Sequence, residues 1–148
     1  MTLTTTYFSN NLADIHMVIA LMKGVLHVQY HSMDIEDWMY AYFVADAYCK
    51  HLSGPLAKYA ASRCGNVDEM LNQMQELRQR LAERLAQKEA EVWLHFAMLA
   101  DSAIEIGRCN DDPLVPAENK RYYAMFVSVA QMFDQERGDT KFSDRLKI

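Results

Sequence analysis

Glycine and proline are scarce in this chain, with five glycines and three prolines among its 148 residues. Tight turns depend on these two residue types, so few places are left for the many short hairpins of a β-rich fold. The apolar residues are chiefly leucine, methionine, alanine and aromatic residues, and this mixture favours helices over strands. The composition therefore predicts an all-α fold.

Paired cysteines are also absent. Cys49, Cys64 and Cys109 are odd in number and widely spaced, and none belongs to a CxxC motif. This pattern disfavours both a disulfide framework and a zinc knuckle. A chain of this length buries ~70% of the surface of its extended form, enough to fold without cross-links. We expect a single all-α domain over 1–148, with reduced thiols, in the cytoplasm.

No stretch concentrates lysine or arginine, and twenty acidic against fifteen basic residues give a net charge of −5. A surface that follows a phosphate backbone needs basic clusters, so we expect no binding of nucleic acid. No apolar run reaches the ~20 residues that span a bilayer, and residues 1–11 lack the basic and apolar segments of a signal peptide. The isolated glycines form no phosphate-binding loop. We expect a soluble protein that is not exported and has no membrane partner.

Start signals and apolar spacing predict four to five helices in a bundle-like domain, over about 11–32, 35–52, 55–64, 67–107 and 116–136. Asp34 is expected to cap the second of these helices, whose first turn carries Glu36 and Asp37. Gly138 is expected to close the last one. The polar tail at 139–148 is either docked through its few apolar side chains or frayed.

The segment from about Val67 to Gly107 has a helical apolar period and contains no proline and no earlier glycine. It predicts one helix of roughly 40 residues, against a usual length of about 10–14. Whether this helix is straight or folds back near 84–91 is left open. Its charged first half surrounds a narrow apolar stripe, formed by Met70, Met74, Leu77, Leu81 and Leu85. We expect this stripe to bind another protein or a second copy of the chain.

Aromatic residues crowd the predicted helix at 35–52, which contains Trp38, Tyr40, Tyr42, Phe43 and Tyr48. Tyr40 and Phe43 lie off its main apolar face. Aromatic side chains are enriched in the cores of interfaces, and they also fill the interiors of domains. The helix is therefore either part of an interface or a central helix buried on two faces.

Histidines supply the strongest candidate for a metal site. On the predicted first helix, His16 and His27 lie within roughly 40° of one another, and His31 lies about 40° further round. The i,i+4 spacing of His27 and His31 lets two imidazoles reach one divalent metal ion, and Asp34 joins them if the helix extends that far. The alternative is that this stripe simply faces water. We expect no cofactor and keep a metal on His16, His27 and His31 as a second hypothesis.

A further candidate is Glu91 with His95, also four residues apart. Di-iron bundles use a Glu-x-x-His motif with carboxylates on facing helices. Here the spacing is one residue longer and no second motif follows, so we expect His95 to be a hydrogen-bonded core or interface residue.

The sequence contains no catalytic signature that joins a nucleophile to a base, so an enzyme is not expected. We expect a non-catalytic α-helical interaction module, such as an adaptor or a chaperone-like, inhibitory or regulatory protein. It would bind a protein partner and form a homodimer through the long helix. The alternative is a helical bundle that binds a metal or a small ligand through the histidines.

Overall fold

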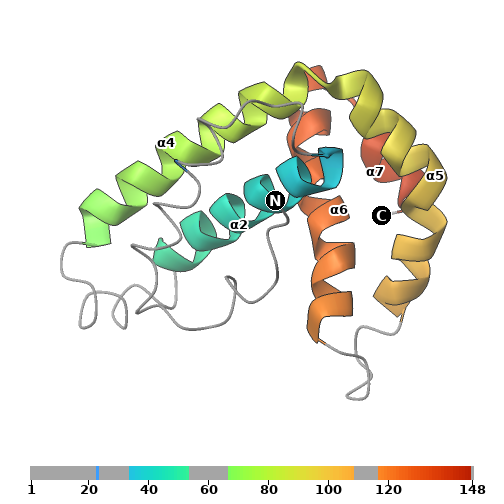
Figure 1. Ribbon diagram of the computed structural model, residues 1–148, viewed down its shortest axis with the longest axis horizontal. Coiled ribbons are helices and arrows are strands. Elements are labelled where there is room, and N and C mark those ends of the chain that lie inside the picture. The colour runs from blue at the N-terminus through green and yellow to red at the C-terminus, as the bar shows by residue number, and fades with distance from the viewer. Residues whose placement is uncertain (1–22, 24–33, 54–66, 109–116, 148) are drawn as a thin grey trace. The chain divides into compact units, whose positions relative to one another are not determined.

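The computed structural model describes residues 23, 34–53, 67–108 and 117–147 (Figure 1). Within these residues it contains helices and no strand, which confirms the all-α prediction. The helices are α2 (Ile35–Leu52), α4 (Val67–Ala86), α5 (Glu89–Arg108), α6 (Ala117–Arg137) and α7 (Lys141–Arg145). The helices predicted at 11–32 and 55–64 lie outside the described residues, apart from Lys23, which is helical and exposed.

Contacts within the chain form two compact units, residues 1–83 and 84–148, and each is described by itself. The boundary falls inside α4, close to its carboxyl end. None of the described helices is long and apolar enough to cross a membrane.

The segment predicted as one long helix forms two. A two-residue turn, Gln87–Lys88, separates α4 from α5, and each of these helices has 20 residues. The amide of Lys88 donates to the carbonyl of Leu85, only three residues back, at 2.9 Å, so the backbone is wound more tightly here than in an α-helix. The prediction of one helix of roughly 40 residues is therefore corrected, and the break lies in the window that the sequence left open.

Charges mark the two helix ends at this turn. Arg84 lies in the last turn of α4, where a cation is favourable, and Glu89 and Glu91 lie in the first turn of α5, where anions are favourable. The charges therefore favour the end of one helix and the start of the next at this turn. The turn itself contains neither glycine nor proline, the residues that commonly end a helix.

In the first unit, α2 has the predicted bounds. Its start is fixed by Asp34, whose Oδ1 accepts a hydrogen bond from the amide of Asp37 at 2.9 Å, as predicted for a cap. Three of its aromatic side chains, Trp38, Tyr42 and Tyr48, are at most 8% exposed. Buried residues, among them Met39, Ala41 and Val44, occur on more than one side of this helix, as expected for the alternative in which α2 is buried on two faces.

A buried carboxylate joins α2 to α4 within the first unit. Asp46, 8% exposed, lies 2.9 Å from the Nζ of Lys50 on its own helix and 3.2 Å from an Nη of Arg78 on α4. A carboxylate with so little access to water needs such partners, because an unpaired buried charge is strongly destabilising. This cluster fixes the register of the two helices.

The second unit contains α5, α6 and α7, which pack side by side (Figure 1). Its centre is an aromatic cluster in which the ring of Phe142 lies 5.2 Å from Trp93, 5.1 Å from Phe96 and 4.6 Å from Phe133, between centroids. Phe96 in turn lies 4.9 Å from Phe126. The described part of the tail, residues 139–147, is therefore docked and not frayed, which decides between the two alternatives that the sequence left open.

Two hydrogen-bonded turns hold this tail. Gly138 has a φ of +73° and closes α6 as predicted, and its amide donates to the carbonyl of Asp134 at 2.8 Å. The carboxylate of Asp134 then accepts the amides of Phe142 at 2.9 Å and Ser143 at 3.0 Å. One buried side chain thus caps α7 and ties it to the end of α6.

Candidate functional site

The predicted histidine site lies outside the described residues, because His16, His27 and His31 all belong to 1–33. The metal hypothesis therefore stays a prediction. Its fourth proposed ligand, Asp34, is described, and its Oδ1 caps α2. Among the residues that the structure describes, no three His, Cys, Asp or Glu side chains gather closely enough to hold a metal ion.

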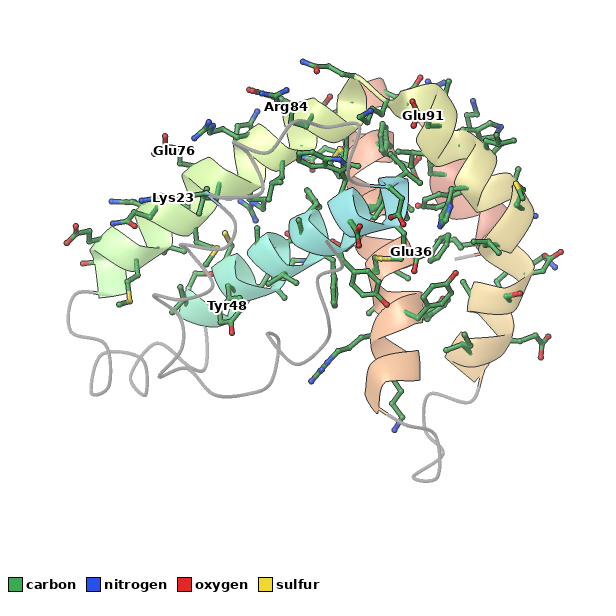
Figure 2. The ribbon with its side chains drawn as sticks, in the orientation of Figure 1. Lys23, Glu36, Tyr48, Glu76, Arg84 and Glu91 are labelled. Atoms are coloured by element: carbon green, nitrogen blue, oxygen red, sulfur yellow. The ribbon has the colours of Figure 1, made fainter. Side chains whose placement is uncertain are left out.

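Glu91 and His95 have different surroundings. The imidazole of His95 stacks on Phe126, with ring centroids 5.8 Å apart and planes 12° apart, and is half-buried. The carboxylate of Glu91 points outward, with 65% of its side chain exposed, and lies 3.9 Å from the ammonium of Lys88. His95 is therefore part of the packing between α5 and α6. Glu91 belongs to the surface of α5 (Figure 2).

The apolar stripe on α4 is covered within the single chain. The exposed fractions of Met70, Met74, Leu77, Leu81 and Leu85 are 3, 0, 2, 0 and 0%. An apolar stripe of this width packs equally well on the rest of its own chain or on a partner, so the sequence pattern could not separate the two uses. A partner would reach these side chains only after the chain opens.

A different apolar pair faces water. Leu94 and Met98, on α5, are 60% and 72% exposed, and they are the large apolar side chains exposed in the described part of the chain. They are four residues apart and therefore adjacent on one side of the helix. Burying one such side chain contributes about 1.5–3 kcal/mol relative to leaving it exposed. The sequence interpretation did not single out this pair, because residues 92–106 are mostly apolar and Leu94 and Met98 do not stand out among them.

Acidic residues bracket this pair along the helix. At 100° per residue, Asp101 and Glu105 lie within roughly 40° of Leu94, and Glu91 lies about 60° from it on the preceding turn. The side chains of Asp101 and Glu91 are 79% and 65% exposed, and Glu105 is also exposed. We call these five residues the α5 outer face. It combines an apolar centre with a carboxylate before it and two after it.

Side chains from α6 and α7 anchor α5 at two points, one of which is Asp101 of this face. Arg145 donates to the carbonyl of Ala97 at 2.8 Å and to the carboxylate of Asp101 at 3.3 Å. At the start of the helix, Arg137 donates to Glu89 at 3.1 Å. The outer face therefore lies on a helix that is anchored at its first turn and again near its middle.

Close packing fixes the far end of α5. A Cβ built on Gly107 would lie 2.8 Å from the ring of Tyr123, so the backbone of α5 touches that ring directly. The sequence placed Gly107 at the helix end, and the structure places it in the last turn of α5. The absence of a side chain is what allows α5 to approach α6 here.

Cys49 is the cysteine that the structure describes, and its surroundings suppress the reactivity of its thiol. Burial raises the pKa of the thiol to about 11, and the nearby Arg78 guanidinium lowers it only in part, while Asp46 adds to the rise. A nucleophilic cysteine needs a lowered pKa and access to solvent. At neutral pH, Cys49 is therefore an inert thiol, 3% exposed.

Comparisons with protein-family models, with curated proteins and with solved structures found no match to this chain.

Proposed function

We propose that the protein is a non-catalytic α-helical interaction module that binds another protein through the α5 outer face. The supporting observation is the exposure of Leu94 and Met98 side by side on one helix. Apolar residues exposed singly are normal on soluble proteins, whereas contiguous apolar patches rimmed by polar residues mark interaction sites. Methionine adds a flexible side chain that adapts to a partner's surface.

Four polar residues with structural roles support the proposal of a non-catalytic protein. Asp34 and Asp134 cap helices, and Asp46 pairs with the bases that join α2 to α4. Cys49 is held as a neutral thiol. Each of these groups has a structural reason for its position, so no reaction is needed to explain them.

Self-association through the α4 stripe stays an alternative to this proposal. The sequence predicts a homodimer through the α4 stripe, and that stripe is buried in the single chain. A dimer that uses it requires the covering part of the chain to move away first. The α5 outer face is accessible without such a change, and for this reason we propose it as the binding surface.

Site-specific photo-crosslinking tests the proposal. A photoreactive amino acid at position 98 should give discrete adducts with another protein in cells that express the full chain. The matched control carries the same group at Gln79, which is exposed on α4. Adducts at position 98 that are absent from position 79, and that disappear after Leu94→Gln, are the expected result. Equal labelling at both positions, or no adduct at position 98, contradicts the proposal.

A further inference from the structure

We infer that the α5 outer face binds an amphipathic helix whose apolar side chains are bracketed by lysine or arginine. This inference rests on the proposed function and adds the chemistry of the partner. Three arguments support it: the shape of the exposed apolar pair, the charges at its two ends, and the poor fit of a second copy of the chain on the same face.

The apolar centre fits a helix. Leu94 and Met98 form a short ridge along the axis of α5, with the small residues Ala90 and Ala97 exposed beside it. A partner helix places apolar side chains at the same i,i+3 or i,i+4 spacing and so covers this ridge with one of its own faces. An extended strand would need a free sheet edge, and the described residues contain no strand.

The charges specify the flanks of that helix. Glu91 lies before the apolar pair, and Asp101 and Glu105 lie after it. The bases nearest to two of these carboxylates are Lys88, at 3.9 Å from Glu91, and Arg145, at 3.3 Å from Asp101. Glu91 and Asp101 are themselves 65% and 79% exposed, so each carboxylate keeps oxygen lone pairs open to a basic partner beside the base that it already contacts. Lysine or arginine on both sides of the apolar residues matches this arrangement.

A second copy of the chain fits poorly on the same surface. If two α5 helices pair antiparallel with Leu94 opposite Met98, Glu91 of each copy lies opposite Asp101 of the other. This follows because Glu91 and Asp101 are equally far from the middle of the apolar pair. A parallel pairing places each carboxylate opposite its own copy. Like charges across an interface are unfavourable, so both arrangements favour a basic partner over self-pairing.

Peptide selection tests the inference on the full chain. The probe is a displayed library of short random segments, selected on the protein at low salt. Segments that also bind the Leu94→Gln/Met98→Gln variant are removed. The survivors should form amphipathic helices in which lysine and arginine flank two apolar residues. Survivors that are acidic, or not helical in pattern, or no survivors at all, overturn the inference.

A charge variant then tests the flanks directly. For a selected peptide, Glu91→Gln/Glu105→Gln should weaken binding roughly three- to tenfold at low salt, and the difference should shrink at high salt. The matched control, Glu76→Gln/Glu83→Gln, removes the same charge from exposed positions on α4 and should leave the affinity unchanged. An equal loss of affinity in both variants would mean that the peptide is attracted only by the net charge of the chain. That result would contradict a specific site on the α5 outer face.

The two proposals fail in different ways. If photo-crosslinking at position 98 captures a protein through a segment without basic flanks, the interaction module stands and the basic helix is wrong. If the captured protein is the chain itself, the homodimer replaces the basic partner. If position 98 gives no adduct in cells while basic peptides still bind in vitro, the preference of the face for a basic helix is correct. The proposal that the face binds a protein in cells is then wrong.

Discussion

Cys49 gives a residue-scale prediction for the pH dependence of stability. The folded pKa is about 11, against 9.0 for a free thiol, so the unfolded chain loses its proton first as the pH rises. The contribution to the free energy of unfolding is complete below pH 9 and is lost between pH 9 and 11, by on the order of 1–2 kcal/mol. The test uses a Cys64→Ser/Cys109→Ser background and measures the free energy of urea unfolding across this pH range. The chain that keeps Cys49 should lose more of this free energy as the pH rises than its Cys49→Ala derivative.

The Ala derivative is the control for the other effects of high pH on the chain. Their contributions are the same in both chains and cancel in the comparison. Parallel pH profiles for the two chains would show that burial does not hold the thiol neutral.

Gly107 gives a second residue-scale prediction. Alanine is the better helix former by up to about 1 kcal/mol, but its Cβ would lie 2.8 Å from the ring of Tyr123. Overpacking of this kind costs about 1–3 kcal/mol, and the gain is smaller in a last turn, so Gly107→Ala should destabilise the chain by about 1 kcal/mol. Thermal unfolding measures the change. In a Tyr123→Ala background the same substitution should be neutral or stabilising, and a higher melting temperature for the single variant would contradict the contact.

At the scale of residues, the sequence predicted what depends on near neighbours. The Asp34 cap and the Gly138 closure involve atoms within four residues, and both were predicted correctly. The exposure of Leu94 and Met98 depends on which other helices cover α5, and the residues flanking them are as apolar as those of a core helix. No local pattern in the segment distinguishes the two cases.

At the scale of elements, the attachment of α7 is the clearest case. A helix of five residues does not form alone, because its first turn costs more conformational entropy than its few bonds return. Asp134→Ala removes both amide bonds to its first turn and should destabilise the chain by about 2–3 kcal/mol. Asp134→Asn keeps one acceptor oxygen, so its free energy of unfolding should lie between those of the unsubstituted chain and Asp134→Ala. Urea unfolding gives the free energies.

Hydrogen exchange checks that the effect of these variants is local. The amides of Phe142 and Ser143 should exchange faster in Asp134→Ala, while those in the middle of α2 keep their protection. A uniform loss of protection would mean that Asp134 supports the whole chain and not α7 in particular.

The break between α4 and α5 shows why element boundaries were only partly predictable. The bounds of α2 and α6 follow from capping residues and were close to the prediction. The turn at Gln87–Lys88 carries no such residue, and the apolar period continues through it, since Leu85 and Val92 are seven residues, or about two turns, apart. The change of charge from Arg84 to Glu89 was the one local signal for this break.

At the scale of the whole molecule, the proposed mode of binding predicts a monomer. The α4 stripe is buried, and pairing two α5 outer faces would place carboxylates opposite one another, so the purified chain should have a mass near 17.1 kDa. Light scattering coupled to size exclusion measures this mass. A value twice as large that returns to the monomer after Leu77→Glu/Leu81→Glu, with helicity retained, would support the stripe as a dimer interface.

A metal assay on the same peak tests the histidine hypothesis. The interaction module predicts no bound metal and a melting temperature that is indifferent to chelators. Stoichiometric metal that is lost in His27→Ala/His31→Ala would make the histidines of the predicted first helix the functional site.

The positions of the two tryptophans have a practical consequence. Trp38 lies in the first unit and is 1% exposed, and Trp93 lies in the second unit against the ring of Phe142 and under the ammonium of Lys141, 4.3 Å from its centroid. Indole fluorescence responds to such surroundings, so the chain carries one intrinsic optical reporter in each unit. Replacing either indole by phenylalanine leaves the other as a single emitter. The melting of each half can then be followed in the intact protein without any added dye.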